Sequence, residues 1–563
     1  MVRLSGWVIV CALCVAAPSE AVGQVVPALP GAVQPGGVER SLEQRLPSVA
    51  PDTVRIPSPQ GFEAPAGAEK FHFVLRHITI TGAHALSGDQ LKLAYQALIG
   101  RDVTLADIYA AARAITDLYA RHDYAISFAM VPAQEIDKAK GEVRIDVIEG
   151  YVGRLSYSGK SPYVARLYGD HILASRPLLS SDLDHSLLLM NDLPGLTAHG
   201  VFQRLDNAPA GDTELAIAAT QDPLTGQLSF DNRGSRAFGP WRASLNVGLN
   251  SLLGLGEQVA FTGVRALNAN ELSYGAVKTS LPLGGGGWVF STNTTYTSAH
   301  PGTPLLTSAG LNSSGWTSQA SVSDPVLRSR FDSLWLWGGV SADWLHSDFF
   351  TTPNSQDHIF SLQGGLIWNS RDAFGQTALD ATVSQGLPVF GAAGSVSPLR
   401  SRINGSGVYT SLKADATRLQ ALPANFGLYL AAKGQFASRG LLAPDQCGYG
   451  GGSIGHGFDD NEIVGDHCVE GLAELRFTPQ IEGKILSQIQ PFISFDAGAV
   501  WNEGPAEPGT YSHATGDSAG AGLRAELFHE VQLSVEYDKP IGRDVALEGN
   551  RNGRLFFFVG AAW

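Results

Sequence analysis

The chain has 563 residues, of which 44% are hydrophobic and 16% charged, and its formal net charge is -14 at pH 7. This acidic balance argues against nucleic acid as a partner, because phosphate binding needs clustered Lys and Arg. Beyond the N-terminal region no run of about 18 or more apolar residues occurs, so no membrane-spanning helix is expected.

The first residues have the pattern of a secretory signal. Arg3 precedes an apolar run over residues 7–17, and small residues follow. These are the charged, apolar and cleavage regions of an exported protein, with cleavage after Ala21 or Gly23. Residues 1–23 are therefore expected to be a signal peptide.

Residues 24–70 are rich in Pro and Gly and contain one island with a helical pattern, Val38 to Arg45. The segment is interpreted as a polar helix on a flexible linker. A plain disordered linker is the alternative that composition favours equally.

Residues 71–151 are expected to form an α+β module. Alternation around Ile78 predicts a strand. Ser87 and Gln90 match a capping box, which predicts a helix that ends at Gly100.

A second helix is predicted to begin after Thr104, and the strands Tyr124 to Val131 and Glu142 to Glu149 follow it. The module therefore has the order β-α-α-β-β. The second helix carries its apolar residues on one face: Ile108, Ala111, Ala112, Ile115 and Tyr119.

Residues 152–224 repeat this order more weakly. The segments Leu155 to Ser158 and Thr213 to Ala219 are typical of strands, and Leu183 to Met190 of a helix. A second module of the same kind is expected here, and one larger domain is the alternative.

From residue 225 to 563 the chain consists of short alternating segments separated by Gly, Asn, Asp, Ser and Pro. In one of them Val531, Leu533 and Val535 alternate with polar residues. A membrane protein without spanning helices must be a closed barrel, and roughly ten residues per strand allow about sixteen antiparallel strands. A secreted β-propeller is the alternative, but it does not explain the aromatic residue at the end.

The segment Arg554 to Trp563 alternates without interruption. One face carries Leu555, Phe557, Val559, Ala561 and Trp563. Phe557, Val559 and Trp563 are interpreted as the signal of a barrel's closing strand, whose apolar face contacts lipid. A terminal strand of a soluble sandwich is the alternative.

Cys447 and Cys468 are the only cysteines downstream of the expected signal peptide. In an oxidising compartment such a pair predicts a disulfide. A metal site that also uses His456 and His467 is less favoured, because no tight Cys or His doublet occurs. No metal and no cofactor are expected.

Several segments together resemble the outer-membrane transporters of two-partner secretion, the hemolysin activator and filamentous hemagglutinin transporter family, within the superfamily of barrels that carry POTRA domains. The resemblance covers nearly everything after the signal. The matching segments are Gly100-Arg101, Thr104-Leu105-Ala106-Asp107-Ile108, Pro132 with Gln134, Val147-Ile148-Glu149-Gly150, Leu187-Leu188-Leu189, Asn191-Asp192-Leu193-Pro194-Gly195, Asp231-Asn232-Arg233-Gly234-Ser235 and Leu253-Gly254-Leu255-Gly256.

The resemblance also includes Gly455-His456-Gly457-Phe458 and Glu474-Leu475-Arg476. It implies a long loop that folds back into the barrel, where an arginine at the position of His456 meets an aspartate on the inner wall. The matching wall segment runs from Ser494 to Gly498 and contains Asp496. Strand alternation independently predicts that Asp496 faces the lumen and that Phe495 faces lipid.

Histidine at this position changes the chemistry of the expected anchor, because arginine is always charged and histidine titrates near neutral pH. The anchor is expected to be weaker or pH-dependent, with Asp496 favouring protonated His456. The alternative is that His456 only forms hydrogen bonds within the loop.

Gly451 to Gly455 also fits the G-x-S-x-G pattern of serine hydrolases, with Ser453 as the nucleophile. That motif needs a strand before it and a helix after it. A Gly-rich loop precedes it here and acidic residues follow, so no enzyme is expected.

The expected domains are thus a signal peptide (1–23), a plug helix and linker (24–70), two POTRA domains (71–151 and 152–224) and a membrane β-barrel (225–563). The resemblance implies a transporter in the outer membrane of a Gram-negative bacterium, with its POTRA domains in the periplasm. They would bind an unfolded exoprotein, which then crosses the barrel. The expected partners are this exoprotein, outer-membrane lipid and, during biogenesis, the barrel-assembly machinery. A factor that inserts other barrels, and a passive pore, are the rival functions.

Overall fold

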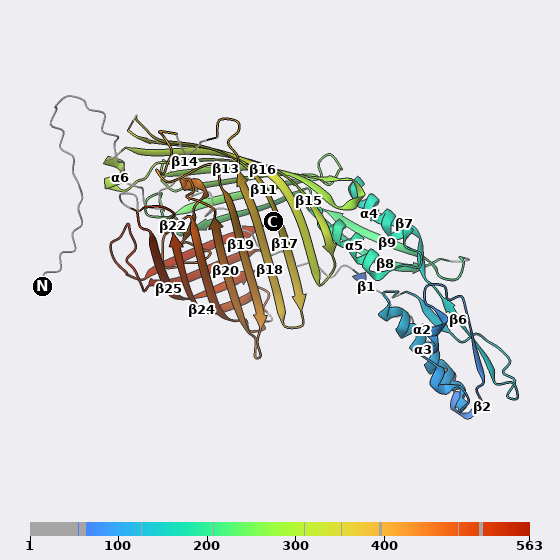
Figure 1. The fold of residues 1–563 in the computed structure, drawn as a ribbon. Helices are drawn as coiled ribbons and strands as arrows, with labels where there is room; N and C mark the ends of the chain where they lie inside the picture. The colour runs from blue at the N-terminus through green and yellow to red at the C-terminus, as the bar shows by residue number, and fades with distance from the viewer. Residues whose placement is uncertain are drawn as a thin grey trace, which may run out of the picture.

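The computed structural model describes residues 54–55, 63–124, 126–205, 208–268, 270–308, 310–350, 352–392, 397–481, 483–505 and 510–563. The expected signal peptide and the expected helix Val38 to Arg45 lie outside these residues. Figure 1 shows two α+β units in a row beside a large barrel. Among the described helices, none is both long enough and apolar enough to span a bilayer.

The first unit contains the predicted β-α-α-β-β order together with two short strands, β2 and β4, that were not predicted. Its elements are η2 (Ala68–Lys70), β2 (His72–Val74), β3 (His77–Thr81), α2 (Gly88–Lys92), η3 (Gln96–Leu98), β4 (Asp102–Thr104), α3 (Leu105–Arg121), β5 (Phe128–Met130) and β6 (Glu142–Ile148). The sheet has the order β3-β6-β5, and β2 pairs with β4. The apolar face predicted for α3 is confirmed, because all five of its residues are buried. The predicted capping box at Ser87 and Gln90 is also confirmed.

Two elements of this unit are shorter than predicted. The helix after Ser87 ends at Lys92, because the chain then turns so that Gly100 N–H donates to Leu75 O at 2.7 Å. The strand expected from Tyr124 to Val131 covers only Phe128–Met130. Its first part forms a turn in which Tyr124 packs its ring 5.8 Å from that of Tyr119. Tertiary contacts override the local pattern in both places.

The second unit repeats the order β-α-α-β-β. Its elements are β7 (Tyr151–Gly159), α4 (Tyr163–Ala174), α5 (Ser180–Asn191), β8 (Leu196–Arg204) and β9 (Asp212–Gln221). The sheet has the order β1-β8-β9-β7, because β1 (Val54–Arg55) adds to the edge of β8 in parallel. One face of this sheet packs against both helices around Leu187, Leu215 and Ile217.

Sixteen strands within the described residues close the predicted barrel. They are β10 (Leu224–Asp231), β11 (Arg242–Asn250), β12 (Gln258–Ala266), β13 (Leu272–Leu283), β14 (Trp288–Ala299), β15 (Leu311–Arg328), β16 (Asp332–Phe349), β17 (Thr352–Asp372), β18 (Gly375–Gly386), β19 (Thr410–Ala421), β20 (Phe426–Ala437), β23 (His467–Phe477), β24 (Leu486–Trp501), β25 (His513–Leu527), β26 (Val531–Pro540) and β27 (Arg554–Ala562). The connections also contain η4 (Gly284–Gly286) and α6 (Pro304–Ser308).

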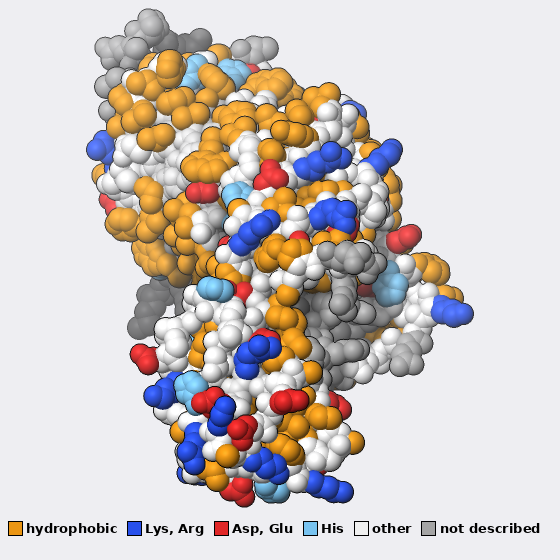
Figure 2. All heavy atoms as spheres, turned by 90° about the vertical axis from the view of Figure 1, so that its right-hand side faces the viewer, with side chains coloured by type: hydrophobic (Ala, Val, Ile, Leu, Met, Phe, Trp, Pro, Cys, Tyr) orange, Lys and Arg blue, Asp and Glu red, His pale blue; other side chains and the backbone are white. Residues whose placement is uncertain are grey.

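The predicted alternation along the strands is confirmed in β24 and β27. Phe495 is 51% exposed on the outer wall, whereas Asp496 is 1% exposed and faces inward. In β27, Phe557 is exposed and the neighbouring Phe556 is buried. Figure 2 shows hydrophobic side chains gathered over the barrel and charged ones over the α+β units.

The second unit is fixed to the barrel by ion pairs at the turn between β15 and β16. Arg328 and Asp192 form a two-point pair with N–O distances of 2.7 Å. Arg330 lies 2.7 Å from Asp184. Because Asp184 lies within α5 and Asp192 directly follows its last residue, the two pairs together set the orientation of this helix against the barrel.

We expect Arg328→Ala to loosen this junction. The change removes both hydrogen bonds of a planar, charge-assisted pair, which contribute about 1.5–3 kcal/mol. Limited proteolysis between residues 221 and 224 should become faster. Adding Asp192→Asn to Arg328→Ala should increase the rate little further, because the ion pair is already lost. Arg371→Ala, which removes an exposed arginine at the neighbouring end of β17, is the control. Unchanged proteolysis in Arg328→Ala would contradict a role in the junction.

Candidate functional site

The connection between β20 and β23 folds back into the barrel. This return loop, residues 438–466, contains η5 (Ala443–Asp445), β21 (Cys447–Tyr449) and β22 (Ile463–Gly465). Most of its residues are buried, including Tyr449 and Phe458, whose ring centroids lie 5.6 Å apart. The loop therefore has its own small apolar core inside the lumen.

Asp496 on β24 holds the tip of the return loop. Its carboxylate accepts hydrogen bonds from Tyr449 Oη and Ser518 Oγ, both at 2.7 Å, and from the backbone N–H of His456 at 3.2 Å. Gly457 N–H donates to Ser518 Oγ at 3.0 Å. A buried carboxylate with three donors is well compensated, so this contact stabilises the folded-back loop.

Glycines on both sides make this close approach feasible. A Cβ at Gly498 would lie 2.4 Å from the ring of Tyr449, and a Cβ at Gly516 would lie 2.6 Å from it. A Cβ at Gly457 would lie 2.8 Å from that of Ser518. The wall glycine Gly498 and the tip glycine Gly457 thus admit the loop.

The side chain of His456 does not reach the expected partner. Its Nδ1 lies 3.0 Å from Glu536 on β26, at an angle outside hydrogen-bond geometry. Arg233 contacts the other oxygen of Glu536, and its guanidinium also lies 3.6 Å from Asp538. The expected pairing of the imidazole with Asp496 is therefore wrong, because that carboxylate already accepts from the hydroxyls of Tyr449 and Ser518 and from the backbone N–H of His456.

Burial changes the pKa of two side chains of the return loop. Burial is the largest influence on His456 and lowers its pKa, but the nearby carboxylates of Glu536 and Asp538 together outweigh it, so the pKa lies above its ordinary value. Burial raises the pKa of Glu462 to about 7, although a hydrogen bond from Ala546 N–H opposes this shift. The cause in the second case is desolvation of a carboxylate.

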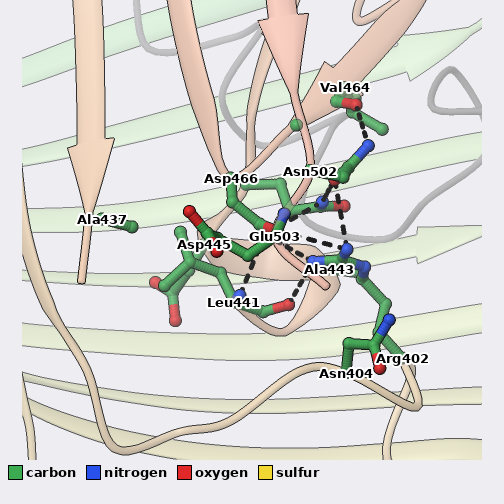
Figure 3. A network of polar contacts seen from close by, with 12 residues as sticks. Arg402, Asn404, Ala437, Leu441, Ala443, Asp445, Val464, Asp466, Asn502 and Glu503 are labelled. Atoms are coloured by element: carbon green, nitrogen blue, oxygen red, sulfur yellow. Dashed lines mark hydrogen bonds and ion pairs between the residues drawn. The ribbon is translucent and has the colours of Figure 1, made fainter. Parts of the chain in front are cut away.

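A buried polar network holds the base of the return loop (Figure 3). Arg402, from the connection between β18 and β19, lies 2.5 Å from Asp466 and 3.1 Å from Asn502 Oδ1. Asp466 also accepts from Leu441 N–H at 2.9 Å and from Glu503 N–H at 2.8 Å. Three connections at one end of the barrel are thereby joined around a single carboxylate.

Cys447 on β21 and Cys468 on β23 form a disulfide within the described residues, as predicted. It links the loop to the wall covalently. The metal site considered for these cysteines is not assembled, because His467 turns away and lies 2.9 Å from Glu503. Ser453 accepts a hydrogen bond from Lys433 at 3.0 Å and lies in a turn rather than at a strand-to-helix junction.

The closing strand lies where its alternation predicts. Phe557, Val559 and Trp563 are exposed on the outer wall. β27 pairs with β10, and the backbones of Trp563 and Gly226 exchange two hydrogen bonds of 3.0 Å. Asn232 adds side-chain bonds to the backbone of Leu555 and Phe557.

Sequence reasoning missed Tyr449, Ser518, Glu536 and Arg402. The alternation of its strand could have predicted that the side chain of Glu536 points into the lumen. Its pairing with His456 was not predictable, because that contact depends on the path of the loop across three strands.

Two family models match the chain. The model of the haemolysin secretion/activation proteins ShlB/FhaC/HecB matches residues 211–523, and that of the ShlB-type POTRA domain matches residues 73–150. The heme/hemopexin transporter protein HuxB of Haemophilus influenzae is 26% identical over 249 residues, which are 42% of this chain and 43% of HuxB. The outer membrane transporter CdiB of Escherichia coli is 23% identical over 61% of this chain and 58% of CdiB. The chain therefore aligns with less than two thirds of either relative.

Solved structures show the same fold. CdiB from Escherichia coli superposes with a TM-score of 0.70 at 19% identity, covering 90% of this chain and 94% of that one. BamA from Haemophilus ducreyi lacking POTRA domains 1–3 gives a TM-score of 0.52 at 14% identity, covering 88% of this chain and 100% of that one.

We expect Tyr449→Phe to weaken the hold on the loop tip. The variant loses one donor to a buried carboxylate, which costs about 1–3 kcal/mol. Single-channel conductance in planar bilayers should show more frequent openings than in the wild type. Tyr537→Phe, which removes a hydroxyl from the exposed outer wall, is the matched control. Identical conductance of the wild type and Tyr449→Phe would contradict this role of the tyrosine.

The raised pKa of Glu462 predicts a pH dependence of stability. The folded protein binds this proton more tightly than the unfolded chain, whose carboxyl titrates near 4.5, so stability is lost as pH rises from there through about 7. In Glu462→Gln the thermal unfolding midpoint should fall less between pH 5 and pH 8. Glu530→Gln, at an exposed position, should retain the wild-type slope. Equal slopes for Glu462→Gln and the wild type would rule out this carboxyl as the source.

Proposed function

The chain belongs to the ShlB/FhaC/HecB family of haemolysin secretion/activation proteins, and we propose that it secretes an unfolded exoprotein through its barrel. Members of this family are transporters, and the chain is not an enzyme. The barrel lies in the outer membrane with its POTRA domains on the periplasmic side. During secretion the exoprotein would first bind the POTRA domains and then pass through the lumen.

The observation that carries the proposal is a loop inside the lumen that is anchored to the wall largely by polar side chains. The return loop fills space inside the barrel and is held by polar contacts at Asp496 and Asp466. Such contacts can be exchanged for water or for a passing chain, which a packed apolar plug does not allow as readily. A helix at residues 38–45, outside the described residues, is proposed as a second closure.

The POTRA sheets offer edges for an extended client. β3 and β5 are the edge strands of the first sheet, and β8 accepts the extended segment Val54–Arg55 in parallel. This pairing supports recognition by β-strand addition, in which backbone hydrogen bonds give affinity with little dependence on sequence. The client's identity is set by side chains along these edges.

A factor that inserts other barrels is the rival function. The fold that this chain shares with BamA favours the rival function, but a likeness at 14% identity shows the fold alone. The match of the chain to a secretion family over residues 211–523 favours secretion.

Deletion of the gene tests the proposal. We expect one large protein, or a small set, to disappear from the culture medium and to return when the wild-type gene is supplied. The amounts of heat-modifiable barrels in the outer membrane should stay unchanged. A general loss of other outer-membrane barrels with an intact medium would instead establish the assembly function.

A further inference from the structure

We propose that His456, Glu536 and Asp538 bind one Zn²⁺ ion, which clamps the tip of the return loop to strand β26. The inference does not depend on what the barrel transports. One ligand lies on the loop and two lie on the wall, so an ion at this position joins two elements that are far apart in the sequence.

The three side chains are placed as ligands. Their donor atoms all lie within 4.8 Å of one another. His456 Nδ1 and Glu536 Oε1 are 3.0 Å apart. In a tetrahedral zinc site with bonds of about 2.0–2.1 Å, neighbouring donors are separated by roughly 3.3 Å. Small rotations of the side chains therefore suffice to enclose an ion.

The same atoms are buried without hydrogen bonds. His456 is 5% exposed, Glu536 6% and Asp538 0%. Neither His456 Nδ1, Glu536 Oε1 nor the two carboxylate oxygens of Asp538 takes part in a hydrogen bond among the described residues. Buried polar atoms are nearly always satisfied, and the ion contacts of His456 with Glu536 and of Arg233 with Asp538 leave these atoms without hydrogen bonds, so a cation between the three side chains would complete their pairing.

Charge and chemistry favour a transition metal. With a neutral imidazole, the two carboxylates and the guanidinium of Arg233 sum to one negative charge, which attracts a cation; a bound divalent ion would leave one positive charge. Arg233 holds the far oxygen of Glu536 and so orients the ligand, as outer-shell partners commonly do. One imidazole and two carboxylates suit Zn²⁺, whereas Ca²⁺ and Mg²⁺ prefer oxygen ligands alone.

The ion would add a second crosslink to the loop. The disulfide of Cys447 and Cys468 joins its base to β23, while the proposed ion joins its tip to β26. The tip crosslink is reversible, because binding displaces a proton from the imidazole and a chelator removes the ion.

Metal titration of the full-length protein in detergent tests this site. After treatment with a chelator, the wild type should take up one Co²⁺ per chain with the visible absorption of a low-symmetry site, and Zn²⁺ should displace it. His456→Ala and Asp538→Asn each remove a direct ligand, so each should weaken Zn²⁺ binding by more than the roughly 10–100-fold that loss of an outer-shell partner causes. His467→Ala, which removes another histidine near the same loop, should bind as the wild type does.

Three results would overturn the proposal: no uptake of either metal by the wild type, equal uptake by His456→Ala, or loss of uptake in His467→Ala. Heat-modifiable migration on a gel shows whether each variant is still a folded barrel. A variant that does not fold is replaced by His456→Gln, which keeps polarity and size but lacks the imidazole ligand. Secretion is measured separately, so a failure of transport does not decide the question of metal binding.

Discussion

The closure of the barrel is the constraint on which the other features depend. In hydrocarbon every backbone N–H and C=O group must be paired within the protein, so a spanning sheet is stable only without free edges. The seam between β10 and β27 meets this requirement, and its ends are reinforced. At one end the backbones of Trp563 and Gly226 bond to each other, and at the other end Asn232 bonds to the backbone of β27.

Closure separates two environments along each strand, and this explains how charges accumulate inside. Residues on the outer wall contact lipid and are apolar, whereas those on the inner wall face water or the return loop. The charged side chains of the loop site lie on this inner side, where Asp496 and Glu536 are buried and Arg233 is partly buried. The polar inner wall of the barrel thus binds the return loop, which connects two of its own strands.

The parts of this fold that could be predicted are those governed by one strand or helix at a time. The two-residue period of β24 and β27 fixes which residues face lipid, and the face of α3 follows from its 3.6-residue period. The partner of His456 was mispredicted, because Asp496 and Glu536 both face inward and only the path of the loop chooses between them. The length of the helix after Ser87 was overestimated for a similar reason, since a hydrogen bond between Gly100 and Leu75 reverses the chain.

The return loop is held at its two ends by different chemistry, and this difference bears on how the lumen can open. At the base, the disulfide of Cys447 and Cys468 is covalent, and the carboxylate of Asp466 is buried among donors from three connections. At the tip, Asp496 and Glu536 hold the loop by hydrogen bonds and charge, and Phe458 packs against Tyr449 in the apolar core. Release of the tip therefore breaks polar contacts and exposes part of this core to water. Release of the base would in addition require reduction of the disulfide and separation of Asp466 from its buried donors.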